Sequence, residues 1–184
     1  MIALSFSGAQ QTQTLSNIMA AMGAVWPLLI DLIVFLGLVM VIGSIFAFIK
    51  AQREGLRAGT GYAFAFFAGI MMTSINAVMN SASESFFNTS SPSSLSLSGA
   101  AYGGSEYGQV VAFVFDVLML WGLWAYYKSF TLLREAGDDR QHFAPAMWHF
   151  VGGVFAVNAQ TILSSVGVSL GGLFQSVVTH ILGG

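Results

Sequence analysis

Two acidic residues lie inside long apolar stretches of the sequence, where a charged side chain is costly. Asp31 begins the run DLIVFLGL, and Asp116 begins the run DVLMLWGL. A carboxyl group in such a place can relay protons, hold an ion, or hydrogen-bond to a packed neighbouring helix. Asn76 and Gln160 lie at a similar depth in two other apolar stretches. The residues Asp31, Asp116, Asn76 and Gln160 are therefore predicted to form one intramembrane polar cluster.

This polar cluster does not continue toward the basic loops of the chain. On that side of Ser74 and Asn158 the two stretches are mainly apolar. A proton or ion path needs a continued series of polar groups, so the pattern favours a structural, hydrogen-bonded role. Contact with another subunit, and a small channel or transporter that uses Asp31 and Asp116, are the alternative interpretations.

No other group of residues has the spacing of a catalytic or metal site. His142 and His149 are seven residues apart, without an acidic residue to complete a metal site, and we interpret them as interfacial histidines. The glycine pairs lack the context of a phosphate loop, and the chain has no Cys. The sequence therefore predicts that the protein is not an enzyme and holds neither a cofactor nor a metal.

The composition indicates that lipid surrounds much of the protein. Hydrophobic residues make up 55% of the 184 residues and charged residues only 8%, whereas soluble domains carry roughly 25% charged residues. The mean hydropathy is +0.74. The net charge of −2 argues against direct contact with nucleic acid, because phosphate binding needs a basic surface.

Four segments are long and apolar enough to cross a bilayer, which takes about 20 residues. They are residues 24–49, 61–79, 108–127 and 145–168. The predicted fold is an all-α membrane protein with four transmembrane helices arranged as two hairpins.

The chain is predicted to divide into three parts. Apolar residues at helical spacing favour an amphipathic helix near each end, lying on the outer membrane face or on a partner. The parts are an outer amphipathic segment, 1–23, a four-helix membrane domain, 24–168, with a Ser-rich outer loop, 80–107, and an outer amphipathic C-terminal helix, 169–184.

All six basic residues lie in two loops, residues 50–60 and 128–144. The positive-inside rule places both loops in the cytoplasm and both termini outside. Contact with phospholipid headgroups is a second role for these residues. They are Lys50, Arg53, Arg57, Lys128, Arg134 and Arg140.

Small and polar residues recur every three or four positions in the second and fourth segments. Such stripes let helices approach closely and hydrogen-bond across the contact. The residues predicted to pack helices in this way are Gly69, Thr73, Gly153, Ala156, Ser164 and Gly167.

The two acidic runs also suggest an internal repeat. Both begin with Asp, continue with five apolar residues and end with Gly and Leu. A duplicated hairpin gives this pattern, although apolar helices also share residues by chance.

Two stretches resemble a known family of membrane proteins. The runs GLVMVIGSIFAFIKAQREG, residues 37–55, and HFVGGVFAVNAQTILSSVG, residues 149–167, are similar to segments of the IcmC/DotE and TraQ group. In the second run the resemblance rests on His149, Gly152, Gly153, Ala156 and Asn158. Members of this group are small inner-membrane proteins of type IVB secretion and IncI-type conjugation systems.

The resemblance implies a multi-pass protein of the bacterial inner membrane. The termini, which the positive-inside rule places outside, are then periplasmic. It implies a structural subunit of a secretion or conjugative DNA-transfer apparatus, whose partners are other membrane subunits, copies of itself being one option. A pilin-like filament subunit is an alternative, because each hairpin also resembles conjugative pilins in layout.

Overall fold

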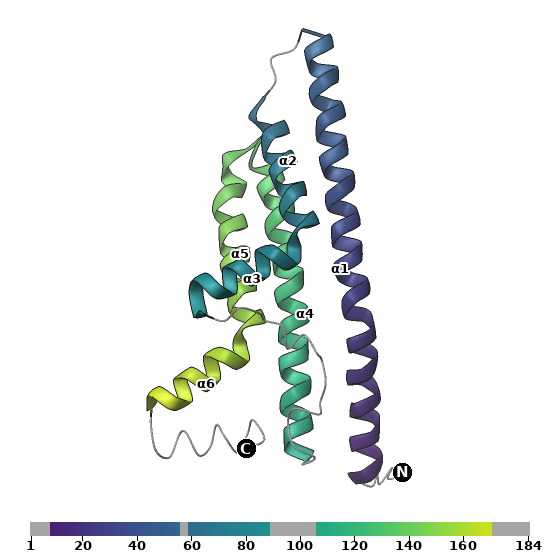
Figure 1. Ribbon diagram of the computed structural model, residues 1–184, viewed down its shortest axis with the longest axis vertical. Helices are drawn as coiled ribbons and strands as arrows, with labels where there is room; N and C mark the ends of the chain where they lie inside the picture. Colours follow the sequence, from purple (N-terminus) through teal and green to yellow (C-terminus); the bar gives the residue numbers. More distant parts are fainter. Residues whose placement is uncertain (1–7, 56–58, 89–105, 171–184) are drawn as a thin grey trace, which may run out of the picture.

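The computed structural model describes residues 8–55, 59–88 and 106–170, and this part of the chain is helical, with no strands. Four helices run along the long axis of the molecule, and two shorter ones turn away from it on one side (Figure 1). The helices are α1 (Gly8–Arg53), α2 (Thr60–Thr73), α3 (Ile75–Phe87), α4 (Glu106–Glu135), α5 (Phe143–Val157) and α6 (Ala159–Leu170), with a short 3₁₀ turn at Arg140–His142.

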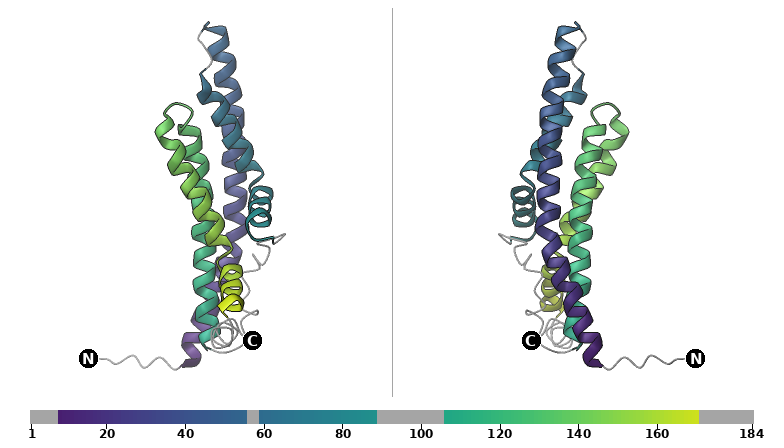
Figure 2. Two further views of the ribbon diagram at one scale, coloured as in Figure 1. Left: turned by 90° about the vertical axis from the view of Figure 1, so that its left-hand side faces the viewer. Right: turned by 90° about the vertical axis from the view of Figure 1, so that its right-hand side faces the viewer.

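The long helices form two hairpins, α1–α2 and α4–α5, which lie side by side (Figures 1 and 2). The end of α1, the start of α2 and the turn between α4 and α5 lie at the same end of the molecule, where Thr60 Oγ1 donates a hydrogen bond to the carbonyl oxygen of Gly137 over 3.1 Å. We call this the basic end, because Lys50, Arg53, Arg134 and Arg140 are there. The start of α4 lies at the opposite end, near the start of α1.

The outer segments differ from their predicted form. Residue 23 is not a boundary, because α1 continues through it, and Met19 packs with Ala112 and Phe115 of α4. Residues 80–87 of the predicted loop belong to α3. The C-terminal helix predicted at 169–184 lies outside the described residues, except for the two residues that end α6.

The second and fourth predicted spans are each broken by a polar residue. Ser74 Oγ donates to the carbonyl oxygen of Ile70 at 2.6 Å, and Asn158 Nδ2 donates to that of Val154 at 2.8 Å. A side chain that bonds the carbonyl four residues earlier competes with the helix ladder and bends the helix. The bend between α2 and α3 is 85°.

These breaks change the number of helices that can cross a membrane. Within the described residues, two helices are long and apolar enough, in α1 and α4, and the bent pair α2–α3 brings the number to three. The second span predicted at 61–79 and the fourth predicted at 145–168 are therefore not single straight helices.

The two hairpins are closed by equivalent contacts between glycines. A Cβ placed on Gly37 would lie 2.8 Å from the carbonyl oxygen of Gly69, and one placed on Gly122 would lie 3.1 Å from that of Gly153. Along the chain, Gly122 follows Gly37, and Gly153 follows Gly69, at the interval that separates the two acidic runs, to within a single position. In both hairpins the helix break comes five positions after the second glycine.

Burial follows the same spacing along the first helices of the hairpins. Ser44 and Ser129 are both buried, as are Ala51 and Ala136, and the members of each pair are separated by the same interval as the two acidic runs. The second hairpin therefore repeats the first in its closing glycines, its buried small residues and its helix break. This correspondence supports an internal duplication.

Candidate functional site: the helix interfaces and the basic-end groove

The centre of the molecule is an apolar core shared by both hairpins. Tyr126 and Phe130 of α4 are fully buried there, together with Ala68 and Met72 of α2. The rings of Tyr126 and Phe150 meet edge to face, with centroids 5.3 Å apart. Helix α4 thus packs on its own hairpin partner α5 and on the first hairpin.

The two intramembrane acids have different surroundings. Asp116 is only 6% exposed, and its Oδ2 has no hydrogen-bond partner among the described residues. Asp31, at the equivalent position of α1, is exposed on the surface. Of the other two residues of the predicted polar cluster, Asn76 is exposed on α3 and Gln160 is half-buried in α6. In the described part of the chain, no hydrogen bond or ion pair joins these four residues.

A polar contact that the sequence did not indicate ties α3 to the second hairpin. Asn158 Nδ2 donates to Ser83 Oγ at 2.8 Å, and both side chains are buried. The same amide group donates to the carbonyl oxygen of Val154, so Asn158 hydrogen-bonds both its own helix at the break and the neighbouring helix α3. A lone asparagine in an apolar segment is a signal for such a contact, but its partner in α3 cannot be identified from spacing.

Gly69 and Gly153, two of the predicted packing residues, lie inside the hairpins. Thr73 is half-buried and donates to the Ile70 carbonyl oxygen, and Ala156 is half-buried. Ser164 and Gly167 are in α6, where their packing lies outside the described part of the structure. The sequence reasoning missed the partners Gly37 and Gly122, because a stripe on one helix does not identify the helix that it meets.

A third glycine contact joins the hairpins at the basic end. A Cβ placed on Gly137 would lie 2.5 Å from Cα of Gly61 and 2.9 Å from Cβ of Phe64. The α4–α5 turn therefore lies against the start of α2, backbone on backbone. The sequence offered no stripe or motif that marks either glycine.

The basic residues near this end differ in their partners. Lys50 forms an exposed salt bridge with Glu54 at 3.9 Å. Arg53, Arg134 and Arg140 are exposed, Lys128 is half-buried, and Arg57 lies outside the described residues. The guanidinium of Arg134 forms no salt bridge in the part of the chain that the structure describes.

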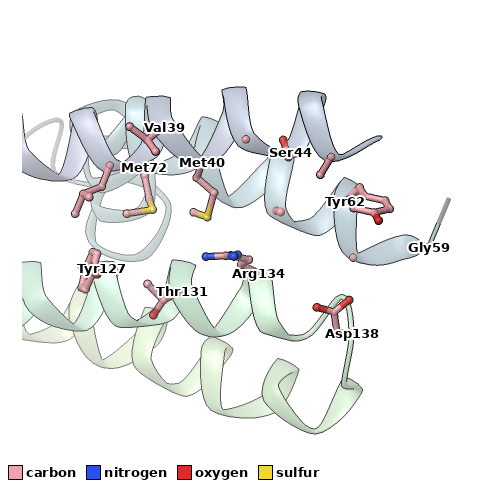
Figure 3. Close-up of a pocket in the computed structure, with 15 residues that line it drawn as sticks. Val39, Met40, Ser44, Gly59, Tyr62, Met72, Tyr127, Thr131, Arg134 and Asp138 are labelled. Atoms are coloured by element: carbon pink, nitrogen blue, oxygen red, sulfur yellow. The ribbon is translucent and has the colours of Figure 1, made fainter. Parts of the chain in front are cut away.

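Beside Arg134 is a groove of about 800 Å³ between α1, α2 and α4. We call it the basic-end groove. Its wall is apolar at Leu36, Met40 and Met72, and its polar mouth includes Thr131, Arg134 and Asp138. The Arg134 side chain extends into the space between α4 and the first hairpin (Figure 3). The groove therefore combines an apolar interior with a cation at its opening.

The fold and the site define an all-helical protein with long apolar helices that could cross a membrane. Among the described residues no group of His, Cys, Asp and Glu could hold a metal ion. No family model matches the chain, and neither a curated protein nor a solved structure does.

Proposed function

We propose that the protein is a structural subunit of a type IVB secretion or conjugative DNA-transfer apparatus in the bacterial inner membrane. Its work is to pack its helices against partner subunits. The resemblance of residues 37–55 and 149–167 to small inner-membrane proteins of such systems supports the choice of apparatus. The helix surfaces support the mode of action.

In this proposal the chain enters the membrane as two hairpins. Helices α1 and α4 cross it, and α2–α3 and α5–α6 return. Helix α2 has 14 residues and α5 has 15, which gives about 21–23 Å at 1.5 Å per residue. Each returning segment thus bends before it completes the roughly 30 Å of hydrocarbon. The basic end is cytoplasmic by the positive-inside rule.

One difference between the repeated hairpins carries the proposed function. On α4, Asp116, Leu123 and Phe130 form one helix face that is buried in the molecule. The equivalent face of α1 consists of Asp31, Leu38 and Ile45, which are exposed. We call it the open face of α1.

The open face of α1 is a poor surface to leave against lipid. A charged residue at the centre of a spanning helix costs roughly 2.5–3.5 kcal/mol on insertion scales. Asp31 has no hydrogen-bond or ion-pair partner in the described part of the chain. A partner helix that bonds Asp31 and covers Leu38 removes this cost.

Affinity purification in a mild detergent tests the proposed function. We expect the wild-type chain to co-purify with other membrane subunits of the apparatus. Asp31→Leu should lose these partners at an unchanged level of protein, because Asp31 takes no part in the fold of the single chain. Asp31→Asn, which still forms hydrogen bonds, should retain them. Co-purification of the same partners with Asp31→Leu would show that the open face is not an interface.

A further inference from the structure

The second hairpin also has an uncovered face, and the repeat identifies it. In the first hairpin, Ala68 of α2 is fully buried and the Cβ of Phe64 lies at the contact with Gly137. Their equivalents in α5, at the interval that relates Gly69 to Gly153, are Gly152 and Trp148. Gly152 is exposed, with no atom within 4 Å of a Cβ placed there, and Trp148 is 76% exposed. We call this surface the open face of α5.

The two open faces correspond to the two sides of a contact that the molecule already contains. Within the chain, Leu123 and Phe130 of the Asp116 face of α4 share one core with Ala68 of α2. Met19 of α1 packs on Ala112 and Phe115, close to Asp116 along α4. The open face of α1 is equivalent to the Asp116 face of α4. The open face of α5 is equivalent to the surface of α2 that includes Ala68. Neither face is covered within the described part of the single chain.

We propose that a second copy of this chain covers these faces, so that the open face of α1 in one copy packs on the open face of α5 in another. This inference rests on the proposed function and names one partner for it. The contact repeats the one between the hairpins and joins different surfaces of the two copies. Such a heterologous contact builds a ring or a filament.

The register of this contact follows from the one inside the chain. Gly137 lies on Gly61, and α4 and α2 are antiparallel. Seven residues from each glycine, two turns along either helix, are Phe130 and Ala68, both 0% exposed. Their equivalents are Ile45 and Gly152, so these two residues should meet between copies.

Disulfide cross-linking in membranes tests the register. Two differently tagged full-length chains are co-expressed, one with Ile45→Cys and the other with Gly152→Cys. The native chain has no Cys, so a mixed dimer on oxidation can form only through these positions. We expect a mixed dimer from this pair. Gly43→Cys with Gly152→Cys is the matched control and should give none, because Gly43 is on the side of α1 that lines the groove and not on its open face.

Each result has a distinct meaning. A chain with Trp148→Cys should cross-link to a partner chain with Gln52→Cys, because their equivalents Phe64 and Gly137 meet inside the chain. Adding Gly152→Leu to the first chain should abolish this dimer, because leucine fills the contact. Two results would overturn the head-to-tail contact. One is a dimer joined only between the Ile45→Cys residues of two copies, without the mixed dimer, and the other is an equal yield of mixed dimer from the Gly43 control. If the chains do not cross-link but other subunits still co-purify, this inference fails and the proposed function stands. If no partner co-purifies, the proposed function fails.

The basic-end groove carries a second, independent inference. Along α1 its lining extends from Leu36 to Ala47, about 16 Å at 1.5 Å per residue. This is close to half of a hydrocarbon layer that is roughly 30 Å thick. The groove thus has the depth of one leaflet, an apolar interior and a guanidinium at the membrane surface.

We infer that the groove binds an acyl chain of an anionic phospholipid, whose phosphate contacts Arg134. Basic residues at the cytoplasmic ends of transmembrane helices attract anionic lipids. Arg134 is suited to this role because it forms no salt bridge among the described residues. Asp138 also lines the mouth, but it lies beyond Arg134 toward the α4–α5 turn, where its carboxylate faces Gly61 (Figure 3).

Photolabelling tests this site. The full-length protein is placed in phosphatidylcholine vesicles with a phosphatidylglycerol that carries a diazirine at the end of one acyl chain. We expect labelling of peptides that contain Met40 or Met72. Arg134→Gln should lower the labelling about fivefold, the effect of one basic residue near an anionic surface. Gly43→Phe should abolish it by filling the groove, whereas Gly152→Phe should not.

Competition distinguishes a lipid from a free anion. Unlabelled phosphatidylglycerol should displace the probe, and inorganic phosphate and phosphatidylcholine should not. Displacement by inorganic phosphate would mean that the site binds an anion rather than a lipid. Labelling of Arg134→Gln and Gly43→Phe at the wild-type level would overturn the assignment.

Discussion

Replacing Gly122 with leucine is expected to disrupt the second hairpin. A Cβ at this position would lie 2.6 Å from Cγ2 of Val157 and 3.0 Å from its backbone nitrogen. The backbone cannot move away without separating α4 from α5, which share the most extensive helix contact. Overpacking typically costs about 1–3 kcal/mol and occasionally more, and we expect the upper end here. The thermal unfolding midpoint in detergent and the amount of protein in the membrane measure the effect.

Because the hairpins are repeated, a leucine at the equivalent glycine of the first hairpin should have the same effect as Gly122→Leu. Two other glycines serve as controls. Gly37→Leu should be as damaging, because its Cβ would lie 2.7 Å from the backbone nitrogen of Thr73. Gly43→Leu and Gly152→Leu should leave the single chain as stable or more stable, since nothing lies within 4 Å of either position. Leucine also gains up to about 1 kcal/mol of helix propensity over glycine. If all four variants unfold alike, the glycines do not close the hairpins.

Replacing Asn158 with leucine is expected to give the second large effect. The amide bonds both Ser83 Oγ and the Val154 carbonyl oxygen in a buried place. Leucine leaves Ser83 Oγ without this donor, whereas the Val154 carbonyl oxygen still accepts from the backbone N–H of residue 158 at 3.2 Å. A buried polar group without a partner costs roughly 1–3 kcal/mol. We therefore expect a lower unfolding midpoint and a looser attachment of α3, seen as faster hydrogen exchange in α3.

Ser83→Ala is the matched control for this prediction. It removes only the bond between helices, and Asn158 still bonds Val154. Hydrogen bonds between membrane helices average about 0.6 kcal/mol, so the loss of stability should be smaller than for Asn158→Leu. A larger loss for Ser83→Ala than for Asn158→Leu would contradict the role given to the asparagine.

The sequence predicted the helical class and the long apolar segments, because hydropathy averaged over the length of a membrane span captures both. It did not predict the helix breaks. Ser74 and Asn158 each break a helix through one bond to a carbonyl oxygen, and an average over a window does not register one bond. Asp31 and Asp116 show a related limit. The two acids begin similar runs, yet one is exposed and the other buried, because burial depends on which hairpin has a neighbour.

The repeat changes how the small residues are interpreted. In the sequence, Gly69 and Gly153 are members of stripes that could face any helix. In the structure they meet Gly37 and Gly122 inside the hairpins, so contacts between subunits have to use other surfaces. The open faces of α1 and α5 are such surfaces.

Cysteine labelling tests the arrangement of the hairpins in the membrane most directly. Gln52→Cys and Gln141→Cys place a thiol in each hairpin near its turn at the basic end, and Ser85→Cys places one on α3; all three residues are exposed. Gly137 is unsuitable for this purpose, because its backbone packs on Gly61.

A membrane-impermeant thiol reagent is added to cells whose outer membrane is permeable and whose inner membrane is intact. The two-hairpin topology predicts that Ser85→Cys is labelled at once and that Gln52→Cys and Gln141→Cys are labelled only after the inner membrane is opened. Labelling of Gln141→Cys from outside while Gln52→Cys stays protected would place the two basic turns on opposite sides and contradict this topology.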